Sequence, residues 1–391
     1  MHTTIFDFLF ILFSIFIFSK FFGEIAIKLG QPEIIGELIA GIVLGPSILG
    51  IVYETQVLSV FSELGIIILL FKVGLSVKLN EFFKSSGFAI IVAIVGVIVP
   101  YILGYFLFLL LGFSNQCSIF SGAMLTATSI GITARIFEDV GCINMEEAKI
   151  ALGAAIIDDI IGVIILTLVV SGLINNQTIK FISIVEILGY IILFISLSII
   201  LGLLILPVLF KFILNTKQHS DVSNLGIALC FVCSALAIKC KLTPIIGAFI
   251  IGIVLSNMNH TIKLKNKVEA LYEFFGPIFF VLMGTKINLG IFNPFIVENL
   301  NRILMIIIIF IISIIGKIIS GFVVMKKKLN QMLIGISMIP RGEVGLIFAQ
   351  IGVNNNILNI EKYSIFSTVI MLTTLITPIL LKSCLSKINK S

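Results

Sequence analysis

The chain is a succession of long apolar runs separated by short polar connections. Most of these runs are long enough to cross the ~30 Å hydrocarbon layer of a bilayer as an α-helix. Their approximate cores are residues 4–22, 33–52, 59–76, 87–112, 117–137, 147–172, 182–214, 223–239, 242–257, 270–287, 303–325, 331–354 and 362–386. The runs lack the strict apolar–polar alternation of a membrane β-barrel strand. The pattern therefore predicts an all-α polytopic membrane protein with about 13 transmembrane helices.

Composition and charge distribution add an orientation to this picture. Of 391 residues, 59% are hydrophobic and 12% are charged, which is about half the charged fraction of a typical soluble domain. The net charge is +6. About 17 Lys and Arg residues follow odd-numbered runs or lie in the C-terminal tail, and about 6 lie on the other side. This bias predicts a protein of the cytoplasmic membrane with its N-terminus outside and its C-terminus in the cytoplasm. It also accounts for the net positive charge, so nucleic-acid binding is not needed to explain that charge.

An internal repeat organises the runs. "IIGELIAGIVL" (34–44) matches "IIGAFIIGIVL" (245–255) at eight of eleven positions, with an offset of 211 residues. The offset corresponds to seven runs, an odd number, so the two halves have opposite orientations in the bilayer. We expect one membrane domain over residues 1–391, without a soluble regulatory domain. It comprises repeat 1 (about 1–175), a linker helix (about 180–215) and repeat 2 (about 220–391). Inverted repeats are typical of secondary transporters.

Three charged residues lie near the centres of apolar runs. Asp158 and Asp159 are neighbours in "ALGAAIIDDIIGVIIL", and Lys317 lies near the centre of "IIFIISIIGKIISGF". A charge in the middle of a span costs about 2.5–3.5 kcal/mol, and such residues usually mark ion or proton pathways. Because adjacent helical residues point about 100° apart, one aspartate can pair with a base while the other faces the pathway. We expect Lys317 to pair with one of them.

Two further stretches predict interrupted helices at matching places in the repeats. "LTATSIGITAR" contains Thr128 and Ser129, and "SMIPRGEVGLIFAQIG" contains Pro340. Proline removes a backbone donor, and hydroxyl side chains offer the backbone other partners. We expect these discontinuous helices to cross near the midplane, where freed carbonyls and hydroxyls could bind a cation. Arg341 and Glu343 follow the second break, and we assign them to gating or to a structural ion pair.

Other function classes lack residues to support them. The chain has no Walker P-loop, no HExxH and no GxSxG, and none of its three histidines lies within a run. We therefore expect no enzyme activity, no ATP binding and no cofactor. The C-x-x-C of Cys230 and Cys233 lies in an apolar run without a second pair, so we interpret it as packing. Three alternatives remain: an intramembrane aspartyl protease, an ion channel, and a Na⁺-coupled solute symporter with a similar inverted-repeat fold.

The motifs together resemble the second large family of monovalent cation:proton antiporters, which contains bacterial Na⁺/H⁺ exchangers and K⁺ efflux antiporters. The resemblance spans nearly the whole chain. It is carried by "QPEIIGELIAGIVLGPSILG", "ELGIIILLFKVGL", "IIDDIIG", "FFGPIFFVLMGTKINL", Gly316-Lys317 and "MIPRGEVGLI". It implies thirteen spans, with a transport core in spans 4–6 and 11–13. It also implies a homodimer formed through spans 1–3 and 8–10.

The resemblance also implies roles for individual residues. Asp159 is expected to be the ion-binding carboxylate, Asp158 the partner of Lys317, and Thr128 and Ser129 ligands on an unwound helix. Na⁺ is expected at Asp159 and Thr128. Family members with two aspartates and the buried lysine are typically electrogenic. Members that release K⁺ usually carry a nucleotide-binding domain, so we expect Na⁺ or Li⁺ exchange for protons, with K⁺/H⁺ antiport as the alternative. Salt tolerance, pH homeostasis and spore germination are all compatible tasks.

The expected mechanism is competition for one site. A carboxylate can hold a proton or coordinate a cation, but not both at once. We expect an empty, fully charged site to cross the membrane reluctantly, which would couple the two fluxes. Alternating access would come from one helix bundle moving against the other around this site.

Overall fold

The protein is all-helical in the part that the computed structural model describes, namely residues 5–169, 181–214, 221–240, 242–256, 261–287, 289–292, 297–326 and 329–388. The elements are α1 (Ile5–Lys28), α2 (Glu33–Leu44), α3 (Gln56–Ser76), α4 (Leu79–Leu110), α5 (Asn115–Met124), α6 (Ile130–Asp139), α7 (Glu146–Val169), α8 (Phe181–Leu214), α9 (Asp221–Lys239), α10 (Pro244–Ser256), α11 (Thr261–Thr285), η2 (Leu289–Phe292), α12 (Val297–Gly321), α13 (Gln331–Ser337), α14 (Glu343–Asn354) and α15 (Ile360–Ile388). Among the described residues, seven helices are long and apolar enough to cross a membrane.

The helix ends follow local sequence signals. The hydroxyls of Thr55 and Ser114 and the side chain of Asn330 cap the N-termini of α3, α5 and α13 by accepting a backbone N–H three residues on. The run expected at 33–52 is helical only to Leu44, because Gly45 and Pro46 follow and α2 ends there. The runs expected at 117–137 and 331–354 are each divided into two helices, as their hydroxyl-rich and proline-containing centres predict.

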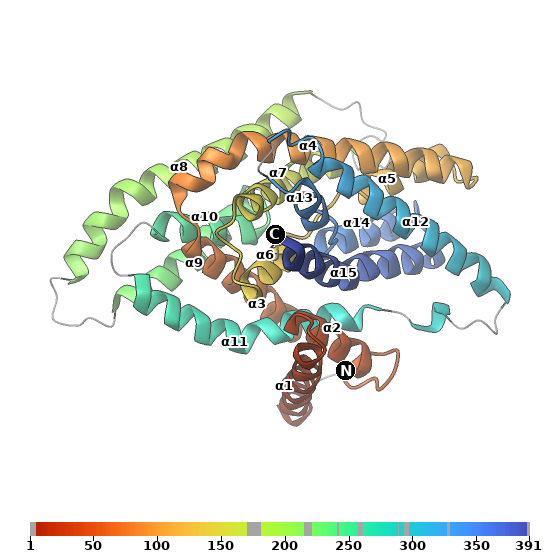
Figure 1. The fold of residues 1–391 in the computed structure, drawn as a ribbon, viewed down its shortest axis with the longest axis horizontal. Coiled ribbons are helices and arrows are strands. Elements are labelled where there is room, and N and C mark those ends of the chain that lie inside the picture. The colour runs from red at the N-terminus through yellow and green to blue at the C-terminus, as the bar shows by residue number, and fades with distance from the viewer. Residues whose placement is uncertain are drawn as a thin grey trace.

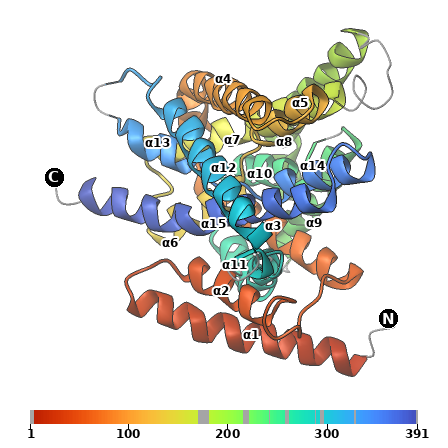
Figure 2. The same cartoon turned by 90° about the vertical axis from the view of Figure 1, so that its right-hand side faces the viewer.

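The helices form two bundles. In the scaffold bundle, α1 packs on α2, α2 and α3 pack on α11, and α10 packs on α3 and α9. In the core bundle, α4 packs on α5, α7 and α12, while α15 packs on α12, α13 and α14. Figure 1 shows α8 along the edge of the molecule beside α9 and α10, and Figure 2 shows α1 lying beneath α2 and α11. The two bundles meet where α6 contacts α2 and α3, and where α15 contacts α2.

Glycines allow the scaffold helices to approach closely. A β-carbon on Gly41 of α2 would overlap the backbone of α11 at Gly284, and a β-carbon on Gly74 of α3 would overlap the backbone of α10 at Gly252. Such backbone contact is typical of membrane helices, in which small residues rather than hydrophobic burial determine packing. The outward faces of α1, α4, α8 and α12 instead carry exposed apolar side chains, among them Phe13, Leu193 and Ile311. These faces suit a lipid environment.

Candidate functional site

The two interrupted helices touch at their breaks. Residues 125–129 separate α5 from α6, and residues 338–342 separate α13 from α14. The backbone N–H of Ser129 donates to the carbonyl of Pro340 at 2.7 Å. The hydroxyl of Thr133 donates to the carbonyl of Ser337 at 2.6 Å, and that of Thr128 reaches the carbonyl of Met338 at 3.5 Å. The breaks therefore satisfy each other's backbone groups, although they lie more than 200 residues apart in the chain.

Arg341 ties the first break to the second. Its side chain is fully buried, and its guanidinium donates to the carbonyls of Leu125 and Ala127, the latter at 3.1 Å, and to that of Ser313 on α12 at 3.4 Å. The hydroxyl of Thr374 on α15 donates to the carbonyl of Arg341 itself at 2.6 Å. Leu125 and Ala127 lie where α5 ends, so their carbonyls have lost the partners that a continuous helix would provide. The guanidinium replaces those partners.

Asp158 and Lys317 form an ion pair beside this crossing. Lys317 Nζ lies 2.9 Å from Asp158 Oδ2, and the two side chains are 0% and 1% exposed. Asp158 is on α7 and Lys317 on α12, so the pair joins two helices of the core bundle. The charge of Arg341 also interacts electrostatically with the Asp158 carboxylate. A buried charge requires such partners, because removing an unpaired charge from water costs several kcal/mol of hydration free energy.

Asp159 points to a different neighbour. Its Oδ2 accepts a hydrogen bond of 3.2 Å from the hydroxyl of Thr243, the residue directly before α10. Asp159 is 6% exposed. Because the two aspartates follow each other on α7, their side chains diverge, and Asp158 is held within the core bundle while Asp159 contacts the scaffold bundle. The neighbouring carboxylates therefore have separate partners.

Several oxygens at the crossing suit a hard monovalent cation. Within the described residues, Asp158 Oδ1 and Ser129 Oγ are buried and have no hydrogen-bond partner. A β-carbon on residue 342 would lie 2.5 Å from Ser129 Oγ, so glycine at that position leaves the hydroxyl its space. Carboxylate, hydroxyl and backbone carbonyl oxygens are the ligand types that hard cations prefer. The donor set therefore fits an alkali cation.

A cavity of about 510 Å³ lies beside Thr243, the hydroxyl that donates to Asp159. Thr243 is part of its wall, and so are Glu63 of α3, Gln350 of α14 and Tyr363 of α15. At its edge, Lys286 Nζ lies 3.1 Å from Glu54, and both also line the cavity. Acidic groups in a cavity with apolar walls raise the local concentration of cations. The cavity thus gives cations an approach to the hydroxyl that touches Asp159.

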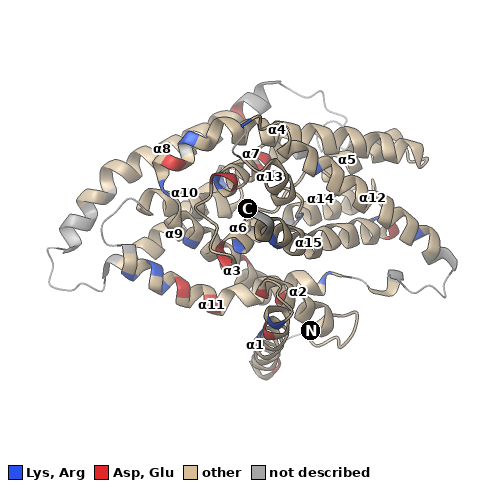
Figure 3. Cartoon of the chain, viewed as in Figure 1, with Lys and Arg blue, Asp and Glu red and all other residues tan. Residues whose placement is uncertain are grey.

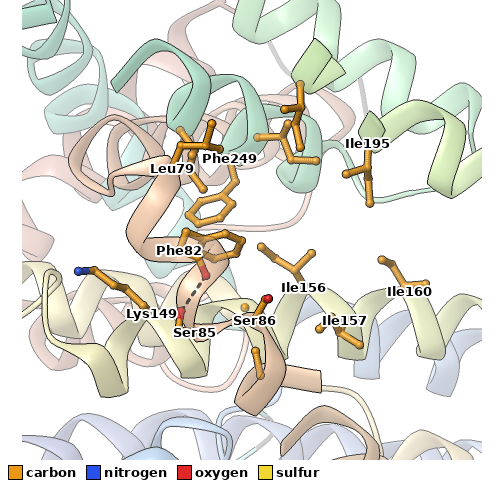
Figure 4. A pocket seen from close by; sticks show the side chains of 15 residues that line it. Leu79, Phe82, Ser85, Ser86, Lys149, Ile156, Ile157, Ile160, Ile195 and Phe249 are labelled. Atoms are coloured by element: carbon orange, nitrogen blue, oxygen red, sulfur yellow. Dashed lines mark hydrogen bonds between the residues drawn. The ribbon is translucent and has the colours of Figure 1, made fainter. Parts of the chain in front are cut away.

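A second cavity, of about 160 Å³, is unsuited to an ion. Figure 4 shows its apolar lining between α4, α7, α8 and α10, with Phe82 and Phe249 facing each other. Its one charged side chain, Lys149, forms an ion pair with Glu81, and this hydrogen bond lowers the pKa of the Glu81 carboxyl. An apolar cavity of this kind excludes cations.

Sequence reasoning missed a cluster of ion pairs at the opposite end of α3 from Glu54. We call it the ion-pair cluster. It comprises Glu33 of α2, Lys72 of α3, Arg135, Glu138 and Asp139 of α6, and Glu269 of α11. Figure 3 shows acidic and basic segments gathered around these helices. Taken alone, each member resembles an ordinary charged residue near the end of a span.

The ion-pair cluster joins the two bundles. Lys72 Nζ lies 3.1 Å from Glu138 and 2.6 Å from Glu269, and Arg135 lies 2.8 Å from Asp139 and 3.4 Å from Glu33. The Lys72 and Arg135 cations lie 4.8 and 4.7 Å from the ring centre of Tyr272 on α11. Lys72 is only 14% exposed and Arg135 only 10%, whereas their partners Glu269 and Glu33 are 46% and 31% exposed. The two cations are therefore shielded from solvent more than these two partners are.

The structure brings most of the sequence-predicted residues together. Thr128, Ser129, Pro340 and Arg341 lie at the crossing, and the Asp158–Lys317 pair lies beside it. Glu343 begins α14, but its side chain lies outside the described residues, so its expected pairing with Arg341 stays a prediction. Thr243 had no distinguishing signal, since a threonine before a proline resembles an ordinary helix start.

Comparisons with known proteins show the family to which the chain belongs. Residues 10–387 match the family of sodium/hydrogen exchangers, transmembrane region. The chain is 30% identical over 98% of its length to a Na⁺/H⁺ antiporter of Enterococcus hirae, and the match covers 99% of that protein. It is 30% identical to the Na⁺/H⁺-K⁺ antiporter GerN of Bacillus cereus, with 96% of each chain covered.

A solved structure has the same fold. The sodium proton antiporter MjNhaP1 of Methanocaldococcus jannaschii superposes with a TM-score of 0.70 at 17% identity, over 98% of this chain and 96% of that one. The family match covers nearly the whole sequence, and the interrupted helices meet beside buried carboxylates. The chain therefore belongs to the sodium/hydrogen exchanger family.

Proposed function

We propose that the protein exchanges Na⁺ or Li⁺ for protons across the cytoplasmic membrane. One observation carries this proposal: two adjacent buried carboxylates lie at a helix crossing, and Asp158 lies 2.9 Å from the buried Lys317. Asp159 accepts a hydrogen bond from Thr243, whose residue lines the cavity of about 510 Å³. Relatives with 30% or greater identity are named Na⁺/H⁺ antiporters, which supports the same ion. The name of GerN includes K⁺, so K⁺/H⁺ exchange is the second candidate.

The chemistry is competition at Asp159. When the carboxylate is ionised it can join Thr128 and Ser129 in binding Na⁺, and when it is protonated it loses most of its affinity for a cation. Lys317 pairs with Asp158, so Asp159 is the carboxylate at which cation and proton compete, while the Asp158–Lys317 pair supplies the second proton that electrogenic exchange requires. Arg341 and Pro340 have structural roles at the crossing, where they keep the two breaks in register. None of these steps requires a cofactor or ATP.

Alternating access follows from the two bundles. With the N-terminus outside, α3 begins outside and ends inside. The cavity at Glu54 and Lys286 then faces the exterior, and the ion-pair cluster lies on the cytoplasmic side. In this arrangement the ion pairs hold the cytoplasmic ends of the core and scaffold bundles together. Movement of the core bundle along the scaffold would break those pairs and open the cytoplasmic side.

The thirteen spans and the inverted repeat belong to this proposal. If α5 with α6, and α13 with α14, count as one span each, the fifteen α-helices in the described part of the chain correspond to thirteen spans. Repeat symmetry is supported by the glycine contacts. Gly252 lies 211 residues after Gly41, and Gly74 lies 210 residues before Gly284. The backbone contact between Gly41 and Gly284 in one half thus has its counterpart in the contact between Gly252 and Gly74 in the other. We further propose electrogenic exchange, and a homodimer formed through the scaffold bundle.

Flux in proteoliposomes tests the function. An internal pH dye would report proton release when Na⁺, Li⁺ or K⁺ is added in turn, with and without an imposed voltage. Asp159→Asn should abolish cation-dependent proton movement, because an amide cannot alternate between a proton and a cation. Glu146→Gln is the matched control, since that carboxylate is exposed and pairs with Lys326 at the surface. Full exchange by Asp159→Asn, or no exchange by the unmodified protein with any of the three cations, would contradict the proposal.

A further inference from the structure

Thr243 is the scaffold's contact with the ion-binding carboxylate. Asp159 belongs to α7 of the core bundle, whereas Thr243 precedes α10 of the scaffold bundle. The hydroxyl-to-carboxylate distance is 3.2 Å. Pro244 opens α10 and fixes the backbone directly after Thr243, so the hydroxyl is presented from a rigid helix start. This contact crosses the boundary along which the bundles are proposed to move.

The spacing of these two oxygens suits a shared cation. A hard cation with metal–oxygen distances of about 2.4 Å holds neighbouring ligands roughly 3.4 Å apart, close to the observed separation. At present the hydroxyl hydrogen occupies this gap by donating to Asp159 Oδ2. A hydroxyl oxygen has two lone pairs, so rotation of the O–H bond would turn a lone pair toward an arriving cation.

Thr243 also lies on the route that a cation would follow. It is part of the cavity wall, whereas Asp159 is 6% exposed. The other hydroxyls that line this cavity are Ser59 and Ser62 of α3 and Tyr363 of α15. Among the described residues, Thr243 combines a place in the cavity wall with a hydrogen bond to an aspartate of the core bundle.

We infer that Thr243 is a specificity-determining ligand, supplied by the scaffold to the cation at Asp159 while the core bundle occupies its present position. This inference rests on the proposed cation exchange. The hydroxyl stays with the scaffold when the core moves, so the cation keeps its core ligands and loses this one. The site therefore has a higher affinity from the cavity side than from the opposite side. On the cavity side the site also discriminates among Li⁺, Na⁺ and K⁺, because the additional oxygen ligand restricts the radius of the cation that fits.

Sided transport assays on two variants test the inference. Thr243→Val keeps the branched shape and removes the hydroxyl, while Thr243→Ser keeps the hydroxyl. Exchange would be measured in right-side-out and inside-out vesicles, varying Na⁺, Li⁺ or K⁺ on the outer side of each. Loss of one oxygen ligand should raise the KM for Na⁺ about tenfold from the cavity side, equivalent to one hydrogen bond to a charged group. We expect KM from the other side and kcat to change less than about twofold.

The outcomes separate the possible roles. Near-normal KM in Thr243→Ser together with the sided defect of Thr243→Val would support the inference. Equal defects from both sides, equal defects in both variants, or an unchanged KM in Thr243→Val would overturn it. The unmodified protein is measured in the same vesicles. Its failure to exchange any cation would contradict the proposed function itself, which distinguishes that result from a failure of the inference.

Discussion

Removing Lys317 should destabilise the protein and make transport insensitive to voltage. Lys317→Met replaces the ammonium with an apolar side chain of similar length and leaves Asp158 without its 2.9 Å partner. Because both side chains are at most 1% exposed, water cannot replace the lost contact. Breaking a buried ion pair by removing one partner costs about 3–5 kcal/mol. At about 2–4 °C per kcal/mol, the melting temperature should fall by roughly 6–20 °C.

A double-mutant cycle separates the pair from the packing. Asp158→Asn alone leaves Lys317 charged and buried, so this variant should also lower the free energy of unfolding by several kcal/mol. In the double variant neither charge remains, and most of the loss should be recovered. Melting in detergent gives the coupling energy as the difference between the double variant and the sum of the two singles. Lys326→Met is the matched control, because its partner Glu146 lies at the surface and such pairs contribute about 0–1 kcal/mol.

Two results would refute this reasoning. If Lys317→Met melted within about 2 °C of the unmodified protein, the ion pair would not contribute the predicted stabilisation. If the double variant were as unstable as the two singles combined, the loss would come from packing. Transport provides an independent measurement. Lys317→Met should still exchange cations through Asp159, and an imposed voltage should no longer change its rate.

Two further predictions concern the crossing and the ion-pair cluster. Arg341→Lys should lower the unfolding free energy by about 3 kcal/mol and impair exchange, because one ammonium cannot reach the carbonyls of Leu125, Ala127 and Ser313 together. Arg302→Lys, whose guanidinium is partly exposed beside Glu361, should melt normally in the same assay. Lys72→Met should accelerate amide hydrogen exchange in α6, because α6 loses its link to Glu269 through Lys72. Lys286→Met, at the cavity edge, should leave α6 unchanged, and equal acceleration by both would contradict a local role for Lys72.

The sequence was most informative where one residue type creates a physical demand. A lysine in the middle of an apolar run needs a carboxylate, and this demand predicted a partner for Lys317. Adjacent aspartates on a helix cannot share one direction, which predicted separate surroundings for Asp158 and Asp159. Pro340 predicted the second helix break. The thirteen-span count, the inverted repeat and the roles of these residues in transport stay predictions.

The sequence was least informative where the partner is a backbone group or a distant, ordinary side chain. Arg341 was assigned to gating or to a structural ion pair, which stays a prediction, and the sequence did not indicate its hydrogen bonds to carbonyls, including that of Leu125, 216 residues away in the chain. No residue type marks a freed carbonyl. Thr243 is one hydroxyl among many. Lys72 and Arg135 each resemble a charge at a helix end, and their shared function is visible only when α3, α6 and α11 are brought together.

The charges at the crossing explain why Lys317 should determine whether exchange moves net charge across the membrane. Among the side chains that the structure describes there, Asp158 and Asp159 contribute two negative charges and Lys317 and Arg341 two positive ones, so the charges of these four groups sum to zero without a bound ion. One Na⁺ or one proton at Asp159 then gives the same charge of +1. Exchange confined to Asp159 would therefore carry no net charge and would ignore voltage. Net charge movement requires a second proton, and the Asp158–Lys317 pair is the neighbouring group that can release one. Without Lys317 the loaded site is neutral with either ion, so the variant should exchange one for one.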